Sequence, residues 1–228
     1  MMKKEIVKTT DGSHTLFVPE LEEHYHSTHG AVQESLHVFI KSGMQYQYKT
    51  QHLSVLEIGF GTGLNALLTK VEAERTGRTV DYTTIEAFPL SWEMVKKMNY
   101  TEVIDSPTQQ KGFEKMHLCD WDSYQKIGEH FKLRKQEVKL QDVSYIEEFD
   151  LIYFDAFSPN VQPELWTEDI FESMYKSLKP NGVLVTYCAK GSVKRALKSS
   201  GFTLESIPGP PGKREMSRGL KFISLKKI

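Results

Sequence analysis

Hydrophobic residues from position 51 onward occur in short runs that alternate with segments of helical periodicity. Short apolar runs bounded by glycine, proline or polar residues predict buried strands, whereas apolar residues three and four apart predict helices. The expected strands are 53–58, 80–85, 115–119, 137–140, 151–154, 183–188, 202–207 and 221–225. The expected helices are 32–40, 64–73, 91–98, 163–178 and 192–199.

The order of these elements predicts an α/β fold. Strands separated by helices form parallel βαβ units, and the last two strands, with no helix between them, predict a terminal antiparallel hairpin. Residues 1–50 are polar and rich in histidine, and only 32–40 has helical periodicity. We therefore expect an irregular N-terminal extension at 1–50, acting as a flap, and one α/β domain at 51–228.

A glycine-rich loop follows the first expected strand. Residues 57–65 read Glu-Ile-Gly-Phe-Gly-Thr-Gly-Leu-Asn, so a strand runs into three alternating glycines and then into a helix. Glycines let the backbone turn tightly and let a ligand lie against it, and free N–H groups at a helix start favour an anionic group. A dinucleotide site would favour G-x-G-x-x-G instead, and a purely structural turn is a further alternative.

The G-x-G-x-G spacing after an acidic residue resembles motif I of class I S-adenosylmethionine-dependent methyltransferases. The resemblance implies a Rossmann-like methyltransferase domain at 51–228, with a mostly parallel seven-stranded sheet and an antiparallel terminal hairpin. It also implies S-adenosyl-L-methionine as the cofactor, with its amino-acid part packed against the loop. The loop residues expected to bind it are Glu57, Gly59, Phe60, Gly61, Gly63 and Asn65.

Residues after the following strands are candidates for contacts with the nucleoside part of the ligand. Glu86 lies 23 residues after Gly63, close to the roughly 20 residues expected for an acid that hydrogen-bonds ribose hydroxyls. Phe88 is expected to pack on the nucleoside. Asp142 is the preferred partner of the adenine amino group, and Asp120 is the alternative. All these groups are expected at the carboxyl ends of parallel strands, where ligands collect.

The apolar strand at 151–154 ends in an acid, Asp155, which is followed by Ala-Phe-Ser-Pro. A carboxylate at such a strand tip costs desolvation free energy, which favours a functional role over helix capping. Transfer of a methyl group from a sulfonium requires an aligned, unprotonated nucleophile. We therefore expect Asp155 to hold an amine nucleophile and accept its proton, with Phe157 and Pro159 as a wall for a flat substrate.

Several longer stretches resemble one family, the methyltransferase part of the bacterial tRNA 5-methylaminomethyl-2-thiouridine biosynthesis enzymes. These stretches cover most of the chain in the family's order, and the Phe-Gly-Thr-Gly-Leu-Asn and Lys-Arg-Glu-Met elements are the most specific. They are residues 59–65 (GFGTGLN), 86–90 (EAFPL), 155–159 (DAFSP), 163–166 (PELW) and 209–216 (GPPGKREM), with a weaker match at 30–40.

The resemblance implies methylation of the amine of 5-aminomethyl-(2-thio)uridine at the tRNA wobble position. It places Asp155 at the family's catalytic aspartate and the Lys213-Arg214 loop at the tRNA entrance, although Gly-Pro-Pro-Gly departs from the family's more basic loop. Many members are fused to an FAD-dependent oxidase. This sequence has no second dinucleotide motif, so we expect no flavin chemistry. The alternatives are a small-molecule or other RNA methyltransferase and an aminopropyltransferase-like enzyme.

Charge is uneven along the 228 residues. From Thr186 to the end there are ten Lys and Arg residues against two Glu, whereas the remainder has 19 basic and 28 acidic residues. A basic end indicates an anionic partner such as nucleic acid, the alternative being a solvated charged surface. The resemblance implies tRNA as the partner, bound at its anticodon region, and the basic end fits this. The expected substrate-binding residues include Lys190, Lys213 and Arg214.

The apolar runs and the histidines of the sequence bear on where the protein acts and on whether it binds a metal. The sequence shows no apolar run of about 18 residues and no secretory leader, so we expect a cytoplasmic protein that binds no membrane. The histidine-rich segment 24–29 has no cysteine and no standard ligand spacing. We expect no metal there, and interpret the segment as a polar flap in which Tyr25 or Ser27 touches the ligand.

Overall fold

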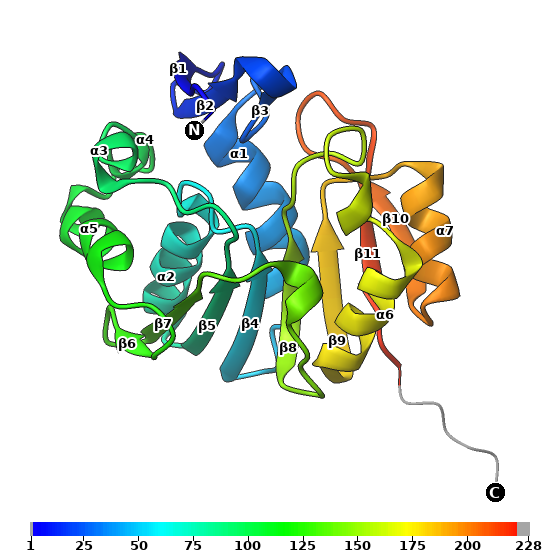
Figure 1. Ribbon diagram of the computed structural model, residues 1–228. Coiled ribbons are helices and arrows are strands. Elements are labelled where there is room, and N and C mark those ends of the chain that lie inside the picture. The colour runs from blue at the N-terminus through cyan, green and yellow to red at the C-terminus, as the bar shows by residue number, and fades with distance from the viewer. Residues whose placement is uncertain (1, 223–228) are drawn as a thin grey trace, which may run out of the picture.

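A mostly parallel eight-stranded sheet lies at the centre of the computed structural model, which describes residues 2–222 (Figure 1). The strand order is β10-β11-β9-β8-β4-β5-β7-β6, and the pairs from β9 to β7 are parallel. The antiparallel β10–β11 hairpin confirms the expected sheet, to which the two-residue β6 adds an edge strand. The bounds are β4 His52–Ile58, β5 Thr79–Ile85, β6 Gln125–Lys126, β7 Phe131–Gln136, β8 Phe149–Phe154, β9 Leu178–Thr186, β10 Thr203–Pro208 and β11 Glu215–Leu220.

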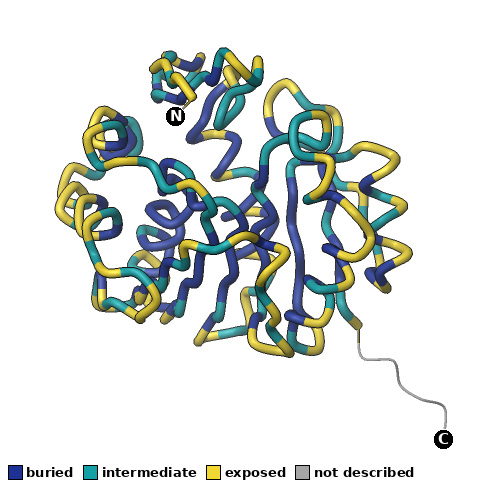
Figure 2. Tube along the Cα trace, in the orientation of Figure 1, coloured by how far each residue is buried: buried dark blue, intermediate teal, exposed yellow. Residues whose placement is uncertain are grey.

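Different helices cover the two faces of this sheet. Successive strand residues point to opposite faces, so Tyr153 packs in the cluster under η2, α2 and α5, and Phe154 in the cluster under α6 and α7. Figure 2 shows that the central strands between these layers are buried. The helices are α1 Ala31–Ser35, the π-helix η2 Leu36–Met44, α2 Leu64–Thr76, α3 Trp92–Val95, α4 Tyr100–Val103, α5 Gln110–Leu118, α6 Glu168–Ser177 and α7 Gly191–Ser199, with 3-10 turns η1 Pro19–Leu21, η3 Pro107–Gln109, η4 Leu140–Asp142 and η5 Pro163–Leu165.

The N-terminal segment forms a small antiparallel sheet of its own, so the expectation of an irregular extension is wrong here. Its strands are β1 Glu5–Lys8, β2 His14–Val18 and β3 Glu23–His24. Asp11, between β1 and β2, attaches this sheet to the start of α1 because its Oδ2 accepts a hydrogen bond from the Gln33 N–H at 2.9 Å. The small sheet lies above the edge toward which β9 points (Figure 1).

The strand expected at 115–119 is wrong. These residues belong to the end of α5 and the turn after it, and Phe113 and Met116 are buried three residues apart, as on one helical face. A five-residue window is too short to distinguish this spacing from a buried strand.

The strand expected at 137–140 is also wrong, because the strand in that region is β7. Its buried alternate positions are Phe131, Leu133 and Lys135, and a charge at the third conceals the apolar alternation. The Lys135 ammonium donates a hydrogen bond to the His117 carbonyl at 2.8 Å, at the end of α5. A lysine can occupy this buried place because its charge meets the negative end of a helix.

Two boundaries differ in the C-terminal half. The helix expected at 163–178 begins only at Glu168, where the Thr167 hydroxyl accepts from the Ile170 N–H at 3.4 Å. The last strand is β11 rather than 221–225. Lys221 and Phe222 are in no strand, and 223–225 lie outside the described residues.

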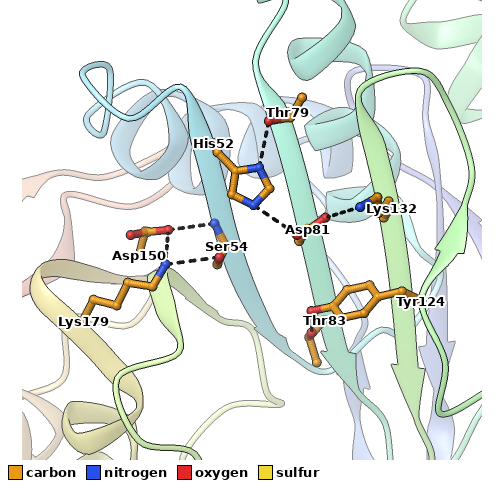
Figure 3. A network of polar contacts seen from close by, with 9 residues as sticks. All are labelled: His52, Ser54, Thr79, Asp81, Thr83, Tyr124, Lys132, Asp150 and Lys179. Atoms are coloured by element: carbon orange, nitrogen blue, oxygen red, sulfur yellow. Dashed lines mark hydrogen bonds and ion pairs between the residues drawn. The ribbon is translucent and has the colours of Figure 1, made fainter.

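Polar contacts join neighbouring strands at the edge of the sheet where the parallel strands begin (Figure 3). Asp150 Oδ2 accepts hydrogen bonds from the Ser54 N–H at 2.8 Å and from Lys179 Nζ at 3.0 Å, which ties β8 to β4. His52 contacts Asp81 at 3.0 Å and thereby ties β4 to β5. This network lies at the edge opposite the carboxyl ends of the strands.

We predict that Asp150→Ala lowers the free energy of unfolding by about 1–3 kcal/mol, because the Ser54 amide loses its acceptor. Lys179→Met is the control, and should cost less than about 1 kcal/mol because the Lys179 side chain is 37% exposed. Urea unfolding of the three proteins measures both values. Equal losses for the two variants would contradict the assignment of the larger effect to the amide.

Candidate functional site

A cavity of about 800 Å³ opens at the carboxyl ends of β4, β5 and β8. The glycine loop, the segment 138–141 and residues 23–28 of the N-terminal segment form its walls. Its volume lies within the roughly 300–1,000 Å³ typical of small-molecule sites. The expected site residues that line it are Gly59, Phe60, Gly61, Asn65, Glu86, Phe88, Asp155, Phe157, Lys190 and Lys213.

Gly59 lies where β4 and β8 leave the sheet side by side. Its φ is +91°, and a Cβ there would stand 2.9 Å from the Asp155 carbonyl oxygen. Gly61, with φ +50°, faces the ring of Tyr25, whose Cδ1 would be 3.3 Å from an added Cβ. Glycine at these two positions therefore lets the loop backbone, which lines the cavity, pass close to the end of β8 and to Tyr25.

Gly63 does not line the cavity. It precedes the first residue of α2 with φ +75°, and a Cβ there would meet His117 Nε2 at 2.6 Å. Burial lowers the pKa of His117 to about 3, so its ring is neutral near pH 7. Gly63 thus lets the loop pack against α5.

We predict that Gly59→Ala weakens S-adenosylmethionine binding by more than about tenfold, about 1.4 kcal/mol, because the new methyl group displaces the backbone of Asp155. Gly77→Ala is the matched control, since Gly77 also has positive φ (+69°) but has nothing within 4 Å of an added Cβ. It should cost about 1 kcal/mol of stability and leave affinity unchanged. Calorimetric titration distinguishes the two, and equal affinities would show that the close approach is unimportant.

The Glu86 carboxylate is fixed beside the glycine loop. Its Oε2 accepts a hydrogen bond from the Gly61 N–H at 3.0 Å, and its Oε1 from the Phe88 N–H at 2.8 Å. The Phe88 side chain is 74% exposed at the cavity. An oriented carboxylate with free lone pairs is suited to accept hydrogen bonds from a diol such as ribose.

Glu86→Ala should weaken cofactor binding by roughly 1–3 kcal/mol, the usual effect of losing hydrogen bonds to a charged group. Glu86→Gln keeps one oxygen acceptor and should lose less. Isothermal titration with S-adenosylmethionine gives both numbers, and an unchanged dissociation constant in the alanine variant would exclude the ribose assignment.

Asn65, in the first turn of α2, reaches across to the end of β8. Its Nδ2 donates a hydrogen bond to Asp155 Oδ2 at 2.8 Å. Among the described residues its buried Oδ1 has no partner. Asn65 therefore fixes Asp155 and leaves a second polar atom for a ligand in the cavity.

Glu57 lies beneath the cavity rather than on its wall. It is 1% exposed, and its Oε2 accepts a hydrogen bond from the Thr84 hydroxyl at 2.8 Å. Burial raises the pKa of Glu57 well above its usual range, so the buried carboxyl tends to be neutral. Its place in the structure favours a supporting role under the loop.

Asp155 is a carboxyl whose protonation changes near neutral pH. Burial raises the pKa of Asp155 to about 7, against the hydrogen bond from Asn65, which lowers it. A group that titrates near the working pH can both accept and release a proton. Asp155 is therefore suited to general base chemistry at this cavity.

Residues after β3 cover the cavity near Asp155. The Tyr25 ring meets the Phe157 ring edge-on, with centroids 5.0 Å apart. Nearby, the Ser158 hydroxyl donates to Glu23 Oε2 at 2.8 Å. Burial raises the pKa of Tyr25, so its phenol remains neutral. This segment and the loop after β8 thus form one wall with two aromatic rings.

Lys213, from the β10–β11 loop, turns into the cavity rather than toward solvent. Its Nζ donates to Glu34 Oε1 at 2.8 Å and lies 4.0 Å from the centroid of the Tyr187 ring. Glu34 Oε2 accepts from the Ser27 N–H at 2.8 Å. Tyr187 in turn donates to the Ala156 carbonyl at 2.9 Å, next to Asp155.

Of the expected residues Asp142, Asp120, Lys190, Pro159 and Arg214, only Lys190 lines the cavity. Asp142 on η4 and its alternative Asp120 are exposed and do not line the cavity. Strand β7 already ends at Gln136. For this reason Leu140 and Gln141, rather than Asp142, reach the cavity wall. Lys190 is an exposed lining residue, with its Nζ 2.6 Å from Asn160 Oδ1. Two further expected residues, Pro159 and Arg214, also lie outside the lining.

Glu34 and Tyr187 are the site residues that the sequence did not indicate. Glu34 lies in the weak match at 30–40 but carries no motif of its own, and Tyr187 looks like one more apolar residue of a strand. Their partners are remote in sequence, since Glu34 and Lys213 are 179 residues apart. In the structure Tyr187 is partly exposed between buried Thr186 and Cys188, so its side chain faces the cavity.

The histidine-rich segment forms part of the cavity wall. Burial lowers the pKa of His26 to about 4, and its Nδ1 lies 3.2 Å from the Thr15 hydroxyl. Within residues 2–222 there is no cluster of three or more His, Cys, Asp or Glu side chains arranged to hold a metal ion. No helix in the same range is long and apolar enough to cross a bilayer.

A sequence profile of the family described as S-adenosyl-L-methionine-dependent methyltransferase matches residues 107–222. Because this match covers half of the chain, the chain belongs to this family. It is therefore a methyltransferase, and its cofactor is S-adenosyl-L-methionine, as the glycine loop indicated.

The curated relatives are more specific. A protein from Leptospira interrogans named tRNA 5-methylaminomethyl-2-thiouridine biosynthesis bifunctional protein MnmC is 30% identical over 211 residues, which cover 88% of this chain and 33% of that protein. The protein of the same name from Cupriavidus metallidurans is 26% identical over 225 residues, which cover 93% of this chain and 33% of that protein. The chain thus spans about a third of the length of the curated relatives it matches.

Solved structures agree on the fold. MNMC2 from Aquifex aeolicus matches with a TM-score of 0.74 and 26% identity, over 96% of this chain and 70% of that one. Spermidine synthase from Thermotoga maritima matches with a TM-score of 0.55 and 14% identity, over 97% of this chain and 69% of that one. The second likeness shows the fold alone.

Proposed function

We propose that this chain methylates the primary amine of 5-aminomethyl-(2-thio)uridine at the wobble position of tRNA. The observation that carries the proposal is the Asn65–Asp155 hydrogen bond of 2.8 Å, which holds a carboxyl with a pKa of about 7 in the same cavity as the glycine loop. The similarity to the MnmC proteins over most of the chain supports the choice of substrate.

The cavity fits S-adenosylmethionine. Its amino-acid part would lie against the backbone of Gly59 and Gly61 and the unpartnered Asn65 Oδ1. Its ribose would be held by the fixed Glu86 carboxylate. The exposed ring of Phe88 and the side chain of Leu140 would pack on its base. When bound, the cofactor supplies an electrophilic methyl group on a sulfonium.

The chain's own groups would prepare the nucleophile. An aliphatic amine is largely protonated at neutral pH and attacks only after losing that proton. Asp155 would hold the ammonium by charge, accept its proton at the carboxylate and aim the nitrogen lone pair. Tyr25 and Phe157 would keep water away from this end and stack on a flat pyrimidine.

The RNA would lie across the basic C-terminal third. An anticodon base must leave its stack to enter a cavity of this kind, while phosphates bind exposed cations. Lys190 and Arg214, both exposed, are suited to phosphate contacts. Lys213 is engaged inside the cavity and is not a free phosphate contact in this structure.

The test is mass spectrometry of nucleosides from tRNA of cells lacking this activity, incubated with the protein and S-adenosylmethionine. We expect conversion of 5-aminomethyl-2-thiouridine to its N-methyl derivative, with weaker binding as salt rises. A parallel reaction with decarboxylated cofactor and polyamines tests the aminopropyl alternative. Polyamine products without modified tRNA would overturn the proposal.

Asp155→Asn should reduce methylation about 10²–10⁴-fold, the usual contribution of a general base, while cofactor affinity stays within about threefold. In the wild type, kcat/KM should fall as pH drops below about 7, because the Asp155 carboxylate becomes protonated there. Activity assays across pH, paired with calorimetry, measure both effects. A fully active asparagine variant would remove Asp155 from the mechanism.

A further inference from the structure

Glu34 and Lys213 form an inward-facing ion pair at the end of the cavity that contains Asp155. The Glu34 side chain is 10% exposed and that of Lys213 35%, with 2.8 Å between Oε1 and Nζ. Both residues line the same cavity as Asp155. The Glu34 carboxylate is largely buried, while Lys213 keeps partial access to solvent, so the position of the pair at the cavity rather than its burial distinguishes it from other ion pairs.

The pair joins elements that are remote in sequence. Glu34, on α1, also accepts the Ser27 N–H from the segment after β3. Lys213 lies over the ring of Tyr187, whose hydroxyl donates to the Ala156 carbonyl. A continuous set of contacts therefore runs from the N-terminal segment to the backbone next to Asp155.

The two charges act on Asp155 in opposite directions. Next to the larger effects of burial and of the Asn65 hydrogen bond, the Glu34 charge raises the pKa of Asp155 and the Lys213 charge lowers it. Asp155, when ionised, and the Glu34–Lys213 pair together carry a single net negative charge. Without Lys213 these groups would carry two negative charges, and without the Glu34 charge they would carry none.

We propose that Glu34 and Lys213 are positioning residues, which hold opposite charges in place beside Asp155 and so match the acceptor end of the cavity to one substrate ammonium. The inference rests on the proposed role of Asp155 as the proton acceptor. It requires that each charge stay in place. The hydrogen bonds that Glu34 accepts from Lys213 Nζ and from the Ser27 N–H meet this requirement.

The other groups around Asp155 do not replace the pair. Asn65 is neutral, burial favours the neutral form of Glu57, and burial raises the pKa of the Tyr82 and Tyr187 phenols. The titratable groups with a charge interaction with Asp155 are Glu57, Tyr82, Tyr187, Glu34 and Lys213. The segment that covers this part of the cavity adds Glu23, Tyr25 and His26. The pair therefore supplies the two opposite charges that are joined by a hydrogen bond at this cavity.

The test is a titration of the Asp155 carboxyl by carbon-13 NMR, assigned with Asp155→Asn. Lys213→Met should raise the Asp155 pKa by about one unit, the low end of the effect of a neighbouring opposite charge. Glu34→Gln, which keeps an oxygen for the Ser27 amide, should lower it. The double variant should titrate near the wild type. Circular dichroism checks that each variant is folded.

Lys190→Met is the matched control, because Lys190 lines the cavity but is not among the charges that act on Asp155. Its Asp155 titration should equal that of the wild type. Shifts of the same sign in Lys213→Met and Glu34→Gln, or no shift in either, would falsify the inference. A merely structural pair predicts that latter result, with activity lowered at every pH.

The acid limb of kcat/KM for tRNA methylation should move with the NMR values, upward in pH for Lys213→Met and downward for Glu34→Gln. The titration needs no substrate, so the two proposals fail separately. Opposite NMR shifts with no methylation by the wild type would overturn the proposed function alone. Methylation with unshifted titrations would overturn the charge pair alone.

Discussion

The site depends on the close approach of two strand ends, those of β4 and β8. Ile58 pairs with Phe154 in the parallel ladder, and the Asp155 N–H donates to the Ile58 carbonyl at 3.1 Å one step beyond it. Gly59 then passes so close to the Asp155 carbonyl that a side chain would collide. The cofactor loop and the candidate base are thus placed by the same backbone contact, and the Asn65 side chain spans the short gap that remains. Orientation of this kind contributes more to a displacement reaction than any single added contact.

The acceptor end is built differently, from segments that approach from outside the sheet. Asp11 holds the small N-terminal sheet on α1, whose Glu34 faces the cavity, and the β10–β11 loop contributes Lys213. The His29 ring occupies the space that a Cβ at Gly212 would need, so the loop and the N-terminal segment also pack directly. Charge at this end therefore depends on the relative positions of two segments. The cofactor end is built around the carboxyl ends of β4, β5 and β8.

This division explains what could be predicted from the sequence. The strands around the glycine loop, the acid at 86 and the acid at 155 were found because each is a local requirement of backbone or burial. Asp142 was chosen wrongly as a cavity residue because buried Lys135 concealed the alternation of β7, so the expected strand moved toward the C-terminus. Lys213 was expected on the RNA surface because the number of charges along a sequence does not show which way each side chain points. Glu34 and Tyr187 were invisible because their roles arise only when distant segments pack together.

The same division bears on how one fold serves different group transfers. The solved spermidine synthase shares the fold at 14% identity, and a sheet that is defined by backbone pairing can tolerate such divergence in sequence. What the transferred group reacts with must then be decided at the other end. That end includes Asp155, Glu34, Lys213 and the rings of Tyr25, Phe157 and Tyr187. Asp155 and Phe157 directly follow β8, and the others come from residues before β4 or after β9. The ion pair that we propose for matching this end to a substrate ammonium joins Glu34 and Lys213, which come from segments on opposite sides of the parallel strands in the sequence.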